Sequence, residues 1–145
     1  MQNFPHQYLA AAIAGTDQSV DIESPGLPSL VSDAPAAFDG PGDQWSPETL
    51  LVAAVADCFI LTFRAITRAS KLSWSSLRCE VEGTLDRVEH VTQFTEFKVS
   101  ASLKVPADAN QERAQRLLEK AEQTCLVMNS LKAASHLTTI IEIAP

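Results

Sequence analysis

The first 63 residues of this 145-residue chain contain neither lysine nor arginine. Eight acidic residues fall in that stretch, and the other ten lie beyond it with all eleven basic residues. The formal net charge of −7 is therefore concentrated in the N-terminal half. An acidic surface repels phosphate backbones, so the charge pattern argues against a nucleic acid partner.

Sequence motifs of several catalytic classes are also missing. There is no Gly-x-Ser-x-Gly, no phosphate-binding glycine loop and no dinucleotide-binding motif. His6, His90 and His136 are scattered without metal-ligand spacing. We therefore expect neither a metal ion nor a cofactor.

Cysteine is scarce and irregular, with three residues and no Cys-x-x-Cys pair. That usage suits a reducing cytoplasm better than a secreted disulfide scaffold. The apolar segment Tyr8–Gly15 is short and follows no basic residue, so it does not resemble a signal peptide. No apolar stretch is expected to reach the roughly 18 residues that span a membrane. We expect a cytoplasmic, non-membrane protein with one domain over residues 1–145.

Residues 46–72 carry the strongest helix signal. Ser46 suits an N-cap, Pro47 suits the first helical position, and Glu48 complements the helix dipole. Apolar residues then recur every three or four positions as far as Ile66. The run is apolar on nearly all sides from Leu50 to Ala56, which predicts a central helix buried all round.

Strand patterns lie on both sides of that helix. The residues predict an α+β domain of order ββ(β)–α–ββ–α–β. The second helix would be capped by Asp108 or Asn110 and continue to Cys125. The predicted strands are Tyr8–Ile13, Val20–Ile22, Ser29–Val31, Trp74–Val88, Phe94–Val105 and Thr138–Ile143, with a hairpin connection at 86–93.

Cys58 and Cys125 lie on the apolar faces of two different predicted helices. Each is either an inert core residue or one half of a redox-active pair that folding brings together. Cys79 falls on the inward face of a strand and is interpreted as structural. A hydrolase that pairs Cys58 with a histidine is a further alternative. Glu48 lies ten residues before Cys58, about 15 Å along one helix, so the two meet only through a kink or a second subunit.

The segment Gly40–Phe59 resembles the helix motif (N/S)PE-x-L-x-x-A-x-x-x-C of the OsmC/Ohr family. The matching residues are Ser46-Pro47-Glu48, Leu50-Leu51, Ala53-Ala54, Ala56 and Cys58-Phe59. Cys125, followed by Asn129-Ser130-Leu131, is similar to the second cysteine motif of that family. The order of elements also matches, so the resemblance covers most of the chain.

The resemblance implies an OsmC-like fold, with antiparallel sheets wrapped around a long central helix in an intertwined homodimer. It implies a cysteine-based peroxidase that reduces organic hydroperoxides in oxidative-stress defence. Cys58 matches the peroxidatic cysteine, Cys125 the resolving one, and Glu48 a glutamate at the dimer interface. The implied partners are an organic hydroperoxide and an external dithiol reductant, such as one of the lipoyl type.

The chain departs from the family pattern at two points. Well-known members hold the thiolate with an arginine in the N-terminal β region, whereas this chain has no basic residue before Arg64. Leu126 stands where many members have proline after the second cysteine. The missing arginine favours an alternative function on the same fold, a non-peroxidatic module that binds a small hydrophobic ligand at the dimer interface.

Overall fold

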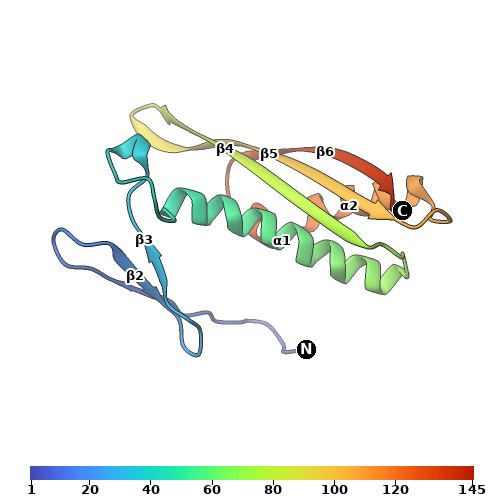
Figure 1. The fold of residues 1–145 in the computed structure, drawn as a ribbon, viewed down its shortest axis with the longest axis horizontal. Helices are drawn as coiled ribbons and strands as arrows, with labels where there is room; N and C mark the ends of the chain where they lie inside the picture. Colours follow the sequence, from blue (N-terminus) through green and yellow to red (C-terminus); the bar gives the residue numbers. More distant parts are fainter. The chain divides into compact units, whose positions relative to one another are not determined.

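The computed structural model describes residues 1–145, which divide into two units, residues 1–50 and residues 51–145 (Figure 1). This division does not test the prediction of one domain over residues 1–145, which stays a prediction. The helix α1, Pro47–Ser70, begins in the first unit and continues through the second. Each unit is described by itself below.

The first unit contains a small antiparallel sheet with strand order β1-β2-β3. Its strands are β1 (Ala11–Ile13), β2 (Val20–Glu23) and β3 (Leu30–Ser32), followed by the 3₁₀ helix η1 (Ala36–Phe38). All three predicted N-terminal strands exist, but the first begins three residues later than predicted. An isolated β-bridge pairs Ser32 with Trp45, just before α1 begins.

The start of α1 confirms Ser46 as its cap. The Ser46 hydroxyl accepts a hydrogen bond from the Thr49 N–H (3.1 Å), while the Ser46 N–H donates to Thr49 Oγ1 (2.9 Å). This reciprocal pair satisfies backbone donors that the first turn of a helix leaves free.

Burial of α1 differs from the prediction. Its buried residues form one stripe at four-residue spacing, which is a single face of a helix. The expectation of a helix buried all round is wrong for the single chain, because Leu50–Ala54 and Ala56 all keep part of their surface exposed. The buried residues are Val55, Phe59, Phe63 and Thr67.

By length and composition alone, α1 is long and apolar enough to cross a membrane. The expectation that no stretch reaches that length is therefore wrong by this criterion. The core helix of a soluble protein passes the same test, and the buried face of α1 belongs to a core shared with strands and a second helix.

The second unit contains a three-stranded sheet of order β4-β5-β6. The strands are β4 (Ser76–Val88), β5 (Val91–Val105) and β6 (Ala134–Ile143). β4 and β5 form an antiparallel hairpin, whereas β6 pairs with β5 in parallel from Glu96↔Ala134 to Val105↔Ile143. This sheet is thus mixed and not wholly antiparallel.

Two helices complete the second unit: α2 (Gln111–Thr124) and the short α3 (Leu126–Asn129), which the sequence did not predict. Of the two predicted caps for α2, Asn110 is the one used, because its side chain accepts a hydrogen bond from the Arg113 N–H (3.0 Å). Cys125 lies between α2 and α3.

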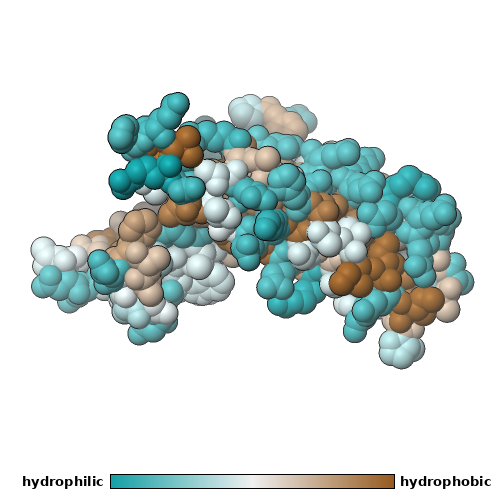
Figure 2. All heavy atoms as spheres, turned by 90° about the horizontal axis from the view of Figure 1, so that it is seen from above, coloured by the Kyte–Doolittle hydropathy of each residue, from teal (hydrophilic) through white to brown (hydrophobic).

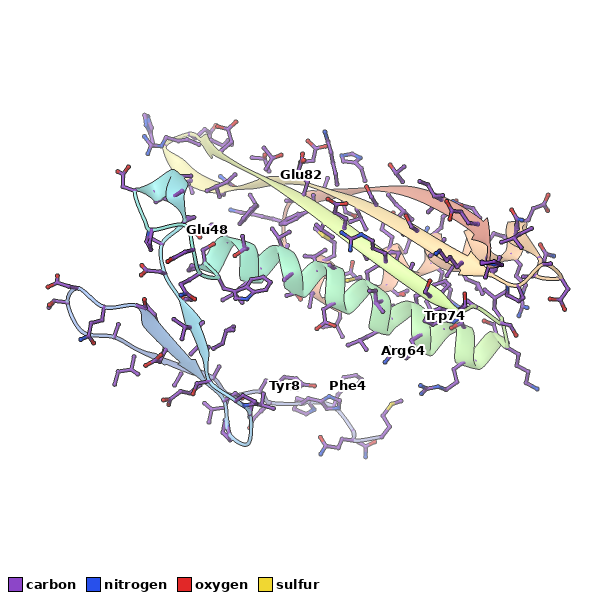
Figure 3. The ribbon with its side chains drawn as sticks, in the orientation of Figure 1. Phe4, Tyr8, Glu48, Arg64, Trp74 and Glu82 are labelled. Carbon is purple, nitrogen blue, oxygen red and sulfur yellow. The ribbon has the colours of Figure 1, made fainter.

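One hydrophobic core joins α1, the sheet and α2. At the end of α1, the Trp74 indole N–H donates to Thr67 Oγ1 (2.8 Å) and its ring meets the Phe63 ring edge to face (Figure 3). These contacts fix the start of β4 against the helix. The buried apolar residues are Val55, Phe59, Phe63, Leu72, Phe97, Val99, Ala101, Leu103, Val105, Ala114, Leu118, Ala121, Cys125 and Met128.

Candidate active site

Cys58 lies at the border between the buried and the open faces of α1. It is half-buried, and it directly precedes Phe59 of the core stripe. Its Sγ lies 3.8 Å from the hydroxyl oxygen of Thr62, one helical turn later. The helix therefore gives the Cys58 thiol one polar neighbour and leaves part of it accessible.

Cys125 is a buried thiol, 2% exposed, and it neighbours Cys58. Burial raises its pKa to about 11, and hydrogen bonding with Cys58 adds to the increase. Hydrogen bonds from the backbone N–H groups of Met128 and Val127 lower the pKa of Cys125 and offset part of this increase. With its pKa raised by burial, Cys125 stays a neutral thiol near neutral pH.

Cys79 belongs to the same neighbourhood. It lies half-buried on the inward side of β4, opposite Ala101, as the strand pattern predicted. Burial raises the pKa of Cys79 to about 12, and the charge of Cys125 contributes a smaller increase. All three cysteines thus lie in or against the same hydrophobic core.

A groove of about 510 Å³ adjoins Cys58. It opens at the surface, since Leu61 and Leu126 at its walls are 49% and 69% exposed. Its walls come from the open face of α1 and the first turn of α3, and Asp57 is the one charged residue among them. The lining residues are Ala54, Asp57, Cys58, Leu61, Thr62, Ala65, Leu126 and Val127.

Glu48 occupies a different environment in the first unit (Figure 3). Its Oε2 is buried and has no hydrogen-bond partner. Glu48 lines a hollow of about 290 Å³ with residues that include Ser32, Asp33 and Phe38. Because α1 is unbroken from Pro47 to Ser70, Glu48 and Cys58 of one chain remain about 15 Å apart along the helix.

No histidine lines the groove at Cys58. His90 lies in the β4–β5 turn, and His136 Nε2 lies 3.7 Å from a carboxylate oxygen of Glu96 at the surface. The groove therefore offers Cys58 no imidazole base, which weighs against the hydrolase alternative.

Sequence reasoning missed part of this site. Asp57, Leu126 and Val127 were not predicted to lie beside the Cys58 thiol. A signal was present for the latter two, because an apolar pair follows Cys125 directly in the chain.

Comparison with known proteins identifies the family. The model of the family described as OsmC-like protein matches residues 40–140. The uncharacterised protein YmaD of Bacillus subtilis (strain 168) is 31% identical over 131 residues, which are 88% of this chain and 87% of that protein.

Solved structures share the fold. The OsmC-like protein of Mycoplasma pneumoniae has a TM-score of 0.78 at 14% identity, over 98% of this chain and 100% of that one. An organic hydroperoxide resistance protein of Elizabethkingia anophelis has a TM-score of 0.74 at 20% identity, over 99% of this chain and 100% of that one. The organic hydroperoxide resistance protein OsmC of Legionella pneumophila has a TM-score of 0.72 at 23% identity, over 97% and 99%.

The match to residues 40–140 includes both Cys58 and Cys125, and the fold agrees over nearly the whole chain. This chain belongs to the OsmC-like protein family.

Proposed function

We propose that this protein is a cysteine-based peroxidase that reduces organic hydroperoxides, in defence against oxidative stress. One observation carries the proposal: a partly accessible thiol, Cys58, faces an open apolar groove and touches a second, buried thiol, Cys125. Structural neighbours named organic hydroperoxide resistance proteins support it.

In the proposed reaction, the Cys58 thiolate attacks one oxygen of the O–O bond of a hydroperoxide ROOH. The alcohol ROH leaves, and Cys58 becomes a sulfenic acid. The Cys125 thiol condenses with that sulfenic acid, which forms the Cys58–Cys125 disulfide and releases water. An external dithiol, such as one of the lipoyl type, then reduces the disulfide by thiol–disulfide exchange.

The groove explains why an organic substrate is proposed. Leu61, Leu126 and Val127 offer apolar surface to an alkyl chain, which hydrogen peroxide lacks. The neutral thiol of Cys125 beside Cys58 is the group that would condense with an oxidised Cys58.

We further propose that the active form is a cytoplasmic homodimer. The single chain leaves one face of α1 open and the Glu48 Oε2 without a partner. A second copy of the chain would cover part of that face and leave the groove at Cys58 reachable, and Glu48 would lie at the interface.

The first experiment compares the consumption of cumene hydroperoxide and of hydrogen peroxide with a dithiol reductant. Wild type is expected to reduce the organic peroxide faster, and Cys58→Ser to reduce neither. Cys125→Ser is expected to accumulate a sulfenic acid at Cys58, detected with dimedone on tryptic peptide 1–64, whose sole cysteine is Cys58. Wild type as inert as Cys58→Ser contradicts the proposal.

A second candidate function is a non-peroxidatic module that holds a small hydrophobic ligand. The absence of any lysine or arginine from the groove walls favours it, because no cation there holds a thiolate. It predicts binding of an apolar fluorescent probe by wild type and by Cys58→Ser alike, with no oxidation of either cysteine by hydroperoxide.

A further inference from the structure

The groove at Cys58 is apolar except for one negative charge. Asp57 is exposed and lines the groove next to Cys58, while the remaining walls are apolar or, at Thr62, uncharged. A carboxylate at the rim of an apolar groove lowers the local concentration of anions and leaves that of neutral molecules unchanged.

The helix geometry keeps Asp57 close to anything that reaches Cys58. Consecutive residues of an α-helix differ by about 1.5 Å along its axis. Leu61 lies one turn beyond Asp57 and Thr62 one turn beyond Cys58, so these two pairs form adjacent rows of the same wall. A ligand whose reactive atom meets Cys58 Sγ therefore lies within a side chain's reach of the Asp57 carboxylate.

Within the single chain, no basic residue lines the groove beside Asp57. Arg64, the first basic residue of the chain, lies seven residues after Asp57, two turns further on along the same side of the helix and about 10 Å away along its axis. Asp57 and Arg64 form no ion pair, since the ion pair of this chain joins His136 and Glu96. Arg64 is not among the groove-lining residues, and the net charge of −7 acts in the same direction as Asp57.

We propose that Asp57 is a specificity-determining residue, which makes the Cys58 groove accept uncharged apolar molecules and reject those that carry a carboxylate. For hydroperoxides, this inference rests on the proposed function. The preferred substrates are then neutral alkyl or esterified lipid hydroperoxides, and free fatty acid hydroperoxides are poor ones. The electrostatic selectivity of the groove itself holds for any reagent that reaches Cys58.

The size of the effect follows from Coulomb's law. The Asp57 carboxylate and an anionic ligand at Cys58 would lie about 7 Å apart. At an effective dielectric constant between those of a protein surface and of water, their repulsion slows the reaction of the anion by about three- to tenfold.

A pair of alkylating reagents measures this selectivity without peroxidase activity. Iodoacetamide is neutral and iodoacetate is anionic, and in both cases the Cys58 thiolate displaces iodide to form a thioether. Both rates are proportional to the fraction of Cys58 that is present as thiolate. The ratio of the two rates therefore does not depend on that fraction. The alkylated product is followed by mass spectrometry of tryptic peptide 1–64, separate from the peptides 79–87 and 121–132 that hold the other two cysteines.

In Asp57→Asn, the iodoacetate-to-iodoacetamide ratio is expected to rise about three- to tenfold. Asp108→Asn is the matched control, since it makes the same net-charge change at an exposed turn after β5 and outside the groove. High salt is expected to raise the wild-type ratio towards that of Asp57→Asn. An unchanged ratio in Asp57→Asn, an equal rise in Asp108→Asn, or no alkylation of Cys58 by either reagent overturns the proposal.

The substrate class is tested with linoleic acid hydroperoxide and its methyl ester, which differ only in the charge of the head group. Wild type is expected to prefer the ester in kcat/KM, and Asp57→Asn to lose most of that preference. If no hydroperoxide is turned over while the alkylation ratio shifts as expected, the proposed function fails and the selectivity of the groove stands. If the ester preference is equal in both proteins, Asp57 does not determine specificity.

Discussion

Among the individual residues, Cys125 combines deep burial with a position between two other thiols. It is 2% exposed, and it interacts with Cys58 and Cys79. A buried thiol is stabilised in its neutral form, because the thiolate loses hydration and meets neighbouring sulfur atoms. In the proposed reaction, Cys125 would therefore remain a neutral thiol until Cys58 is oxidised.

This burial predicts a loss of stability at alkaline pH. The folded-state pKa of Cys125, about 11, lies above the ordinary value of 9.0. The stabilisation is therefore fully present below pH 9 and is lost as the pH rises through about 11. Between these limits, the free energy of unfolding of reduced wild type should fall by about 2 kcal/mol more than that of Cys125→Ala.

Urea unfolding under reducing conditions at pH 8, 9, 10 and 11 measures this difference. Leu118→Ala is the control, because it removes a buried side chain that does not titrate. It should lower stability by a similar amount at every pH. Parallel pH curves for wild type and Cys125→Ala would show that the Cys125 thiol is not held in its neutral form.

Among the elements, β4 lies close against α1 at Gly83. A Cβ at that position would lie 3.0 Å from the side chains of Val52 and Phe94 and 3.1 Å from Phe97. The chain therefore has a glycine where the helix and the strand leave no room for a methyl group.

We expect Gly83→Ala to lower the free energy of unfolding by about 1–3 kcal/mol, because the added methyl group forces the neighbouring side chains to shift. Urea denaturation monitored by circular dichroism checks this. Gly15→Ala is the matched control, since its Cβ would meet only the Gln18 side chain at ordinary contact distances of 3.5 Å and above. Equal stability of the two variants would mean that α1 and β4 can separate at little cost.

The sequence predicted the elements well where signals are local. Ser46, Pro47 and the apolar spacing defined α1, and alternation defined β4 and β5. The hairpin between β4 and β5 was predicted too wide, because its tight turn uses Glu89 and His90 at positive φ in place of the usual Asn and Gly. Parallel pairing of β6 with β5 depends on contacts distant in sequence, which alternation does not reveal.

The candidate site was only partly visible in the same way. Cys58 and Cys125 were identified by type and motif, but their contact depends on how α1 and the α2–α3 junction pack against one sheet. Asp57 and Leu126 become groove residues only through that packing. The spacing of residues along the sequence contains no information on that packing.

At the level of the whole molecule, the single chain exposes a large apolar surface. Figure 2 shows hydrophobic residues, in brown, open among hydrophilic ones. In the second unit, exposed apolar side chains such as Leu61, Leu126 and Ile140 support the proposed homodimer, because monomeric proteins rarely expose large apolar patches. The exposed large side chains include Phe4, Tyr8, Leu9, Ile13, Leu27, Phe38, Trp45, Leu61, Leu126 and Ile140.

The proposed homodimer would explain why α1 is apolar on faces that the single chain leaves open. Sedimentation equilibrium should then give twice the chain mass of 15.7 kDa, and the midpoint of thermal unfolding should rise with protein concentration. Leu61→Glu, which places a charge on the open face of α1, should shift the equilibrium towards monomer and lower that midpoint. Lys120→Glu, an exposed change on α2, is the control and should leave the mass unchanged. A monomeric mass at all concentrations with full helicity would contradict the dimer, and the open face of α1 would then need another occupant.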